Sequence, residues 1–151
     1  MPKVSVIIPV YNAGLFIERC ARSLFEQTLD DIEYIFVDDC SPDTSIDVLQ
    51  KVIAEYPQRK ESVTIVHHEV NTGQSGARKT GMHIAKGEYI IHCDADDWVD
   101  LDMYERMYRL AVEKNVEAEC CDIIQERDGF SRVLKCNNRS DHHELMSECI
   151  A

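Results

Sequence analysis

The stretch GEYIIHCDADDWVDLD, residues 87–102, runs from an apolar segment directly into a group of carboxylates. The apolar residues 89–91 predict a buried strand, and five aspartates then fall within the nine positions from Asp94 to Asp102. Carboxylates held this close repel one another, and burying them without partners is costly. A hard divalent cation would relieve the repulsion, and a phosphate-bearing substrate can share such a cation. We therefore expect a metal–diphosphate site here, with Asp94 and Asp96 as candidate ligands; the alternative is a helix N-cap with surface acids.

Strand and helix patterns alternate along the rest of the chain. Apolar and β-branched runs predict strands at 4–10, 33–37, 62–67 and 89–91, and helical spacing predicts helices at 15–28, 45–56, 75–86 and 101–114. Asn12 is a candidate N-cap for the first helix, and Thr44 to Asp47 has capping-box spacing before the second. A fifth strand is expected at 117–125, followed by a hairpin turn at Asp128-Gly129. This order predicts an α/β fold with helices on both faces of the sheet.

Polar residues follow each of the first four strands. In open α/β sheets, ligands bind outside the carboxyl ends of the strands. That rule places four segments along one rim, namely Tyr11-Asn12, Asp38-Asp39, Asn71–Gly73 and Asp94–Asp97. Neither a GxGxxG fingerprint nor a P-loop is present in the sequence. Phosphate would therefore have to be bound by a metal and by side chains.

Several rim residues have an ordinary interpretation beside the functional one. Asp38-Asp39 could cap the following helix or bind a base or ribose, and Tyr11 could pack on the core or stack on a nucleobase. Arg78 could be a solvated charge or a diphosphate ligand. The pairs His67-His68 and His142-His143 lack metal-ligand spacing with cysteines, so we interpret both as structural or incidental.

Composition narrows the class of protein. The 151 residues suffice for one domain, alone or with a fragment of another. The formal net charge of −12 argues against a nucleic-acid partner. Seven cysteines form no CxxC pair, and Cys20 and Cys93 are better explained as small buried hydrophobes than as bridges. With no signal peptide or apolar run of transmembrane length, we expect a cytoplasmic location, with peripheral membrane association possible.

Four motifs together resemble one known family. VSVIIPVYN (4–12), VDDCSPD (37–43), NTGQSGARKTG (71–81) and DADDW (94–98) are similar to the family 2 inverting glycosyltransferases, over about residues 3–115. The resemblance implies the three-layer α/β/α GT-A fold, a nucleotide-sugar donor (commonly a UDP-sugar) and a divalent Mn or Mg ion. It also implies site residues. The nucleotide would contact Pro9, Tyr11, Asn12, Asp39, Arg78, Asp94 and Ala95, and the metal would contact Asp96 and Asp94.

The sequence departs from the family pattern in three ways. Cys40 stands where the family usually has Gly, and Lys79 where it usually has Asn. The general base that deprotonates the acceptor lies after the acidic loop in such enzymes, and Glu119 and Glu126 match no motif for it. We therefore expect a nucleotide-sugar-binding domain at 1–116, the start of a truncated acceptor-side region at 117–151, and an unidentified catalytic base.

The expected function is inverting transfer of a sugar from a nucleotide-diphospho-sugar to a hydroxyl acceptor. The resemblance implies a role in bacterial polysaccharide or cell-surface glycan synthesis. Two alternatives remain open. One is a nucleotide-sugar-binding fragment without transferase activity. The other is a phospho-receiver domain, which also carries paired aspartates at a strand end. Against it, the pair here follows the second strand, and the lysine expected after the last strand has no candidate.

Overall fold

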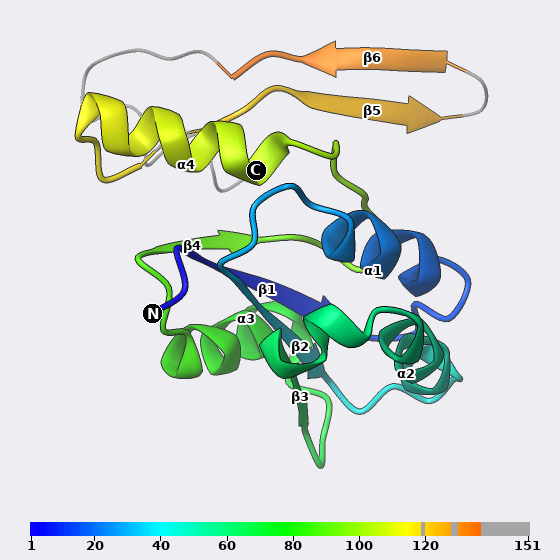
Figure 1. Ribbon diagram of the computed structural model, residues 1–151. Helices are drawn as coiled ribbons and strands as arrows, with labels where there is room; N and C mark the ends of the chain where they lie inside the picture. Colours follow the sequence, from blue (N-terminus) through cyan, green and yellow to red (C-terminus); the bar gives the residue numbers. More distant parts are fainter. Residues whose placement is uncertain (119, 128–129, 137–151) are drawn as a thin grey trace. The chain divides into compact units, whose positions relative to one another are not determined.

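The computed structural model describes residues 1–118, 120–127 and 130–136. The chain divides into two compact units, 1–108 and 109–151 (Figure 1). No helix among the described residues is both long enough and apolar enough to span a membrane.

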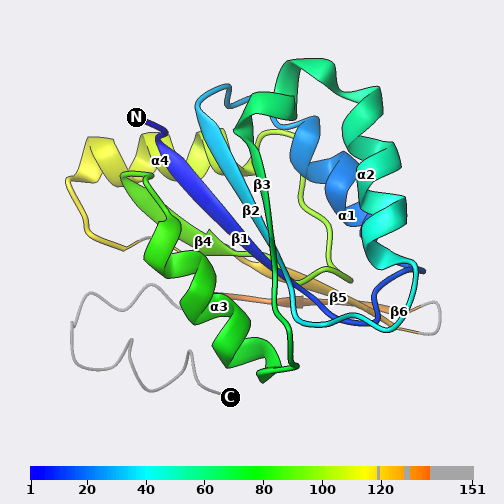
Figure 2. The ribbon, with the colours of Figure 1, turned by 90° about the horizontal axis from the view of Figure 1, so that it is seen from below.

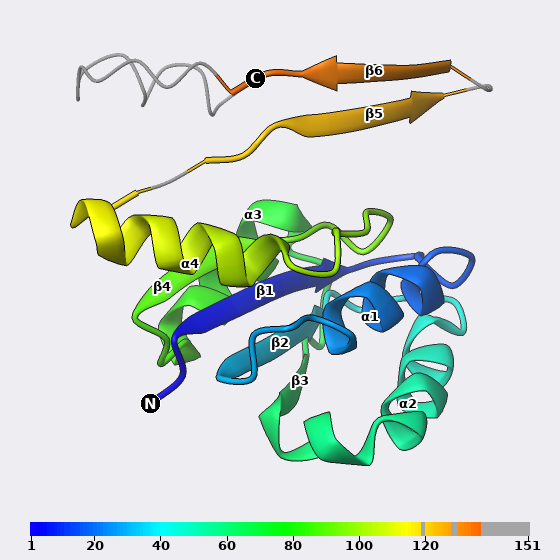
Figure 3. The ribbon, with the colours of Figure 1, turned by 45° about the horizontal axis from the view of Figure 1, so that its top comes forward.

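The first unit is built on a parallel four-stranded sheet, as the sequence predicts. The strand order is β3-β2-β1-β4, so β1 lies between β2 and β4 (Figure 3). Each neighbouring pair is parallel. All four strands therefore end at the same edge. Their bounds are β1 (Val4–Val10), β2 (Ile32–Asp38), β3 (Val63–His67) and β4 (Tyr89–His92).

Helices cover both faces of this sheet (Figure 2). α1 and α2 pack on one face together with the first turns of α4, and α3 packs on the other. This arrangement confirms the predicted α/β fold with helices on both sides. The helical segments are α1 (Ile17–Phe25), α2 (Ser45–Glu55), the short 3-10 helix η1 (Pro57–Ser62), α3 (Gly73–Ile84) and α4 (Met103–Lys114).

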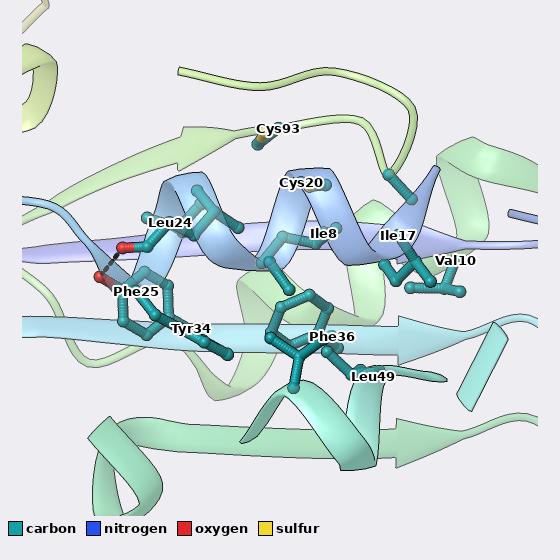
Figure 4. Close-up of a cluster of buried hydrophobic side chains, with 14 of the residues drawn as sticks. Ile8, Val10, Ile17, Cys20, Leu24, Phe25, Tyr34, Phe36, Leu49 and Cys93 are labelled. Atoms are coloured by element: carbon teal, nitrogen blue, oxygen red, sulfur yellow. Dashed lines mark hydrogen bonds between the residues drawn. The ribbon is translucent and has the colours of Figure 1, made fainter. Parts of the chain in front are cut away.

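The larger core lies between the sheet and α1 (Figure 4). Phe25 of α1 meets Tyr34 and Phe36 of β2 edge-on, with ring centroids 5.3 and 6.2 Å apart. Tyr34 is fully buried, and its hydroxyl donates to the carbonyl oxygen of Leu24, which satisfies the one polar atom that the ring brings into the core. Cys20 and Cys93 are also buried here as free thiols, as expected.

The second core forms where α3 crosses the sheet. Ile35, Val37 and Ala77 are fully buried there. Gly81 faces Ile7 so closely that a Cβ atom on Gly81 would lie 2.4 Å from the Ile7 Cγ2 methyl. The absence of a side chain at Gly81 therefore lets α3 lie against β1, and this fixes where α3 begins relative to the strand ends.

The predicted cap at Asn12 is wrong, and the one at Thr44 is right in position but not in its hydrogen bond. α1 begins only at Ile17, and Asn12 instead adopts a left-handed backbone with φ of 52° in the preceding loop. Thr44 occupies the N-cap position of α2 but its side chain makes no capping hydrogen bond. Asp43 replaces it: its Oδ1 accepts from the backbone N–H of Ser45 at 3.1 Å.

The second unit contains an antiparallel hairpin of β5 (Ile123–Arg127) and β6 (Phe130–Leu134). The hairpin is as predicted, although its first strand begins later than expected and the turn residues 128–129 lie outside the described residues. A disulfide joins Cys120 to Cys136. No motif in the sequence indicates this pairing, because the two cysteines lie 16 residues apart in the chain. Glu119 and the pair His142-His143 also lie outside the described residues.

Candidate functional site

A pocket of about 370 Å³ opens at the carboxyl ends of β1, β2 and β4. All four predicted rim segments line the pocket, through Tyr11, Asp39, Asp94 and the pair Asn71 and Gly73. The predicted site residues therefore come together. Those that line the pocket are Pro9, Tyr11, Asn12, Asp39, Asp94, Ala95 and Asp96.

The wall after β1 is a loop fixed by α2. The Gly14 N–H donates to Asp43 Oδ2 at 2.8 Å, and the Ala13 N–H donates to Ser45 Oγ at 2.9 Å. The hydrogen bond from Ser45, together with those from backbone N–H groups, lowers the pKa of Asp43 and keeps it ionised. Tyr11 is 53% exposed, so its ring offers a surface on which a flat ligand can stack.

The floor after β2 is the carboxylate of Asp39, which is 2% exposed. Oδ1 accepts from Thr72 N–H at 2.8 Å and Thr72 Oγ1 at 2.9 Å, and it lies 2.7 Å from His68 Nδ1. Burial would raise the pKa of Asp39, but the hydrogen bonds from Thr72 and His68 outweigh it, and the pKa is lowered. Asp39 is thus an ionised, buried acceptor. Since α2 begins only at Ser45, Asp39 does not cap it.

The wall after β4 pairs the acidic loop with α3. Asp94 Oδ1 accepts from Arg78 Nη2 at 2.8 Å and from Gln74 Nε2 at 2.9 Å. The Nε atom of Arg78 is buried without a hydrogen-bond partner. Arg78 does not line the pocket itself but reaches it through Asp94. The Arg78 guanidinium is therefore separated from the pocket only by the side chain of Asp94.

The carboxylates of the acidic loop repel one another. Burial, and then the charges of Asp96 and Asp94, raise the pKa of Asp97. Asp94 is paired with Arg78, whereas Asp96 is exposed at the pocket. The repulsion expected from the sequence is therefore present, and one cation partner relieves part of it.

A divalent cation fits this donor set only with help from a ligand. The described residues contain no group of three His, Cys, Asp or Glu side chains placed to hold a metal. Two carboxylates completed by substrate phosphates and water are, however, a usual arrangement for Mg²⁺. Asp96 and Asp94 supply hard oxygen donors of that kind, so the residues present fit a metal that arrives with a diphosphate.

Two residues of α1 hold the acidic loop in place. The Cys20 thiol donates to the Asp94 carbonyl oxygen at 3.6 Å, and the Arg19 guanidinium lies 3.1 Å from the centre of the Trp98 ring. Hydrogen bonding to Cys93 and burial raise the pKa of Cys20, so its thiol stays protonated and can donate. α1 thus positions the loop that follows β4.

Sequence reasoning gave no role in this site to Phe16, Gln74 or His68, and it placed Thr72 only on the rim. Phe16 and Gln74 line the pocket, and His68 and Thr72 hold Asp39. The turn at 71–73 marked the neighbourhood of Thr72 and Gln74. Nothing in the spacing of His68 indicates that its ring meets Asp39, because the contact joins two strand ends 29 residues apart.

An open parallel α/β sheet with a pocket at its strand ends is the arrangement in which doubly wound α/β proteins bind their ligands, nucleotides among them. The family model described as "Glycosyl transferase family 2" matches residues 5–147. The chain belongs to this family, its fold is of the GT-A type, and the phospho-receiver alternative is set aside.

Two relatives show how much of such a protein this chain represents. It is 37% identical over 126 residues to the uncharacterized glycosyltransferase EpsJ of Bacillus subtilis, covering 83% of this chain and 35% of the relative. It is 40% identical over 114 residues to the poly(ribitol-phosphate) beta-glucosyltransferase of Bacillus spizizenii, covering 74% of this chain and 17% of the relative. The chain thus spans about a third, or less, of the length of these relatives.

Two solved structures share the fold. One is S. aureus TarS in complex with UDP-GlcNAc, with a TM-score of 0.68 and 26% identity over 75% of this chain and 32% of that one. The other is the mannosyltransferase PcManGT of Pyrobaculum calidifontis in complex with GDP-Man and Mn²⁺, with a TM-score of 0.60 and 29% identity over 64% of this chain and 28% of that one.

Proposed function

We propose that this chain is the donor-binding part of a glycosyltransferase that transfers a sugar, with inversion, from a nucleotide-diphospho-sugar to a hydroxyl acceptor. The observation that carries the proposal is the pocket at the strand ends, where a buried carboxylate, an exposed tyrosine and an acidic loop beside an arginine meet. A UDP-sugar is the proposed donor, and the complex of TarS with UDP-GlcNAc supports that choice.

Each pocket wall suits one part of such a donor. Pro9, Tyr11 and Asn12 would enclose the nucleoside, and Asp39 would accept a hydrogen bond from the base. Asp94, with Ala95 beside it, would face the ribose or the sugar. Arg78 would lie near the diphosphate, where the planar guanidinium matches two phosphate oxygens.

A Mn²⁺ or Mg²⁺ ion held by Asp96 and Asp94, when bound, would neutralise the charge that develops on the leaving nucleoside diphosphate. The chain's own contribution is to hold that ligand set before the donor arrives. The Arg78–Asp94 ion pair and the thiol of Cys20 keep the loop in one position. A preformed site spends little binding energy on rearrangement.

The division of the chain is part of the proposal. Residues 1–116 would form the nucleotide-sugar-binding domain and 117–151 the start of the acceptor-side region. No residue is assigned as the catalytic base. Because the chain spans 17–35% of the two relatives, a donor-binding fragment without transferase activity is the second candidate.

The relatives also suggest where such an enzyme would work. The poly(ribitol-phosphate) beta-glucosyltransferase supports a role in bacterial cell-surface glycan synthesis. We propose a cytoplasmic location, at the inner face of the membrane if peripheral association occurs, and no nucleic-acid partner. Because disulfides are rare in reducing compartments, this location requires that Cys120 and Cys136, which are disulfide-bonded in the structure, be reduced in the cell.

Thermal unfolding tests donor binding. UDP with Mn²⁺ should raise the unfolding temperature, and UDP with EDTA should raise it less, because a ligand that binds only the folded state stabilises it. No shift with any nucleotide would contradict both candidate functions. Release of sugar from labelled UDP-sugars then separates the two: turnover supports the transferase, and binding without turnover supports the fragment.

A further inference from the structure

Two consecutive histidines after β3 pair with two consecutive aspartates after β2. His67 Nδ1 lies 2.9 Å from Asp38 Oδ2, and His68 Nδ1 lies 2.7 Å from Asp39 Oδ1. The two pairs have the same chemistry and come from the same two strand ends. Only Asp39 lines the pocket. The His67–Asp38 pair therefore offers a comparison within the molecule for what the His68–Asp39 pair does.

The environment of His68 fixes which ring nitrogen carries the proton. An ionised carboxylate only accepts hydrogen bonds, so Nδ1 must be the N–H that meets Asp39. In the neutral ring Nε2 is then an acceptor, and the hydroxyl of Thr80 on α3 lies 2.9 Å from it. A chain of hydrogen bonds thus runs from Thr80 through His68 to Asp39 Oδ1.

These hydrogen bonds leave the two oxygens of Asp39 in different situations. Oδ1 receives Thr72 N–H, Thr72 Oγ1 and His68 Nδ1. Oδ2 shares the Thr72 N–H at the longer distance of 3.1 Å. Because three groups hold Oδ1, the carboxylate cannot rotate without breaking them. The acceptor direction of Oδ2 is therefore set before any ligand enters the pocket.

We propose that His68 is a positioning residue of the nucleotide pocket. Supported by Thr80, it orients the Asp39 carboxylate so that this group selects a base carrying an N–H donor at the position it faces. Uracil has such a donor at N3, and cytosine has a bare nitrogen there. The inference rests on the proposed function, since it requires that a nucleobase occupies this pocket.

A purely structural role makes a different prediction. A buried carboxylate needs hydrogen-bond partners for stability alone, and losing one would weaken the fold and the binding of every nucleotide alike. A positioning role affects the choice between bases. The ratio of UDP affinity to CDP affinity is therefore the informative quantity.

The test is calorimetric titration of the full chain with UDP and with CDP, both in Mn²⁺. His68→Leu removes both hydrogen bonds of the ring. His68→Asn retains an N–H near the position of Nδ1, and His68→Gln reaches toward the position of Nε2. We expect His68→Leu to lower the UDP-to-CDP affinity ratio about tenfold, His68→Gln to resemble it, and His68→Asn to stay within about threefold of wild type.

His67→Leu is the matched control, and it should leave the ratio unchanged. Equal ratios in His68→Asn and His68→Gln would overturn the inference even if His68→Leu fails to fold. A wild-type ratio in His68→Leu would also overturn it while leaving the proposed function standing. A wild-type chain that binds neither nucleotide would overturn the proposed function and this inference together.

Discussion

Cys40 shows how one residue can carry backbone strain next to the pocket. It directly follows Asp39, and its φ is 62°, in the left-handed region that favours glycine. Glycine, which the family resemblance implies at this position, would adopt this φ without strain. The Cys40 side chain is exposed, and its thiol makes one long contact, 3.7 Å to the carbonyl oxygen of Glu69. The residue therefore costs stability and gains little from packing.

Cys40→Gly should raise the free energy of unfolding by about 0.5–1 kcal/mol. The strain relieved, about 1–2 kcal/mol, exceeds the cost of the added unfolded-state freedom, about 0.5–1 kcal/mol. Urea denaturation measures the difference. Cys40→Ala keeps the strain and removes the thiol, so it should not gain this stability. An equal gain in both variants would show that the thiol, and not the backbone, is responsible.

At the scale of elements, a single side chain joins the loop after β1 to the start of α2. Asp43 receives N–H groups from both Gly14 and Ser45, so one carboxylate joins the pocket wall to the helix start. Hydrogen bonding by Ser45, then by the backbone, lowers the pKa of Asp43. A lowered pKa in the folded state stabilises the fold above the unfolded value of 3.8, and this stability is lost as the pH falls below it.

Asp43→Ala should therefore lower the free energy of unfolding at pH 7 by about 1–2 kcal/mol. Its loss relative to wild type should shrink as the pH falls below about 4, because the carboxylate of the unfolded chain takes up its proton there and that of the folded chain only at lower pH. Asp47→Asn removes a carboxylate from the same helix without touching these hydrogen bonds, and we expect a change within about 0.5 kcal/mol. A loss in Asp43→Ala that is the same at both pH values would contradict this account.

The elements also show what sequence patterns can and cannot predict. Strands and helices followed from local periodicity, because one buried face imposes it, and the rim followed because parallel strands end at one edge. The cap at Asn12 was wrong because the loop after β1 continues to Ile17, and at Thr44 the position was right but Asp43 makes the hydrogen bond. The contacts His68–Asp39 and Gln74–Asp94 join separate elements. Spacing along the chain carries no information about such pairs.

For the whole molecule, the central claim is that the strand-end pocket binds a nucleoside diphosphate together with a divalent cation. The chain has a net charge of −12, which repels an anionic ligand such as a nucleoside diphosphate. Binding therefore requires positive charge at the pocket. Arg78 supplies one compensating charge at the pocket. We propose that a metal ion at Asp96 supplies the other positive charge that the diphosphate needs.

The most direct measurement is a calorimetric titration of UDP in Mn²⁺, comparing wild type with Asp96→Asn and with Asp100→Asn. Asp100 is an exposed aspartate of the same acidic stretch that does not line the pocket. We predict one UDP bound per chain, an affinity at least tenfold weaker in Asp96→Asn, and wild-type affinity in Asp100→Asn. Wild-type affinity in Asp96→Asn, or no binding of UDP to any of the three, would contradict the account.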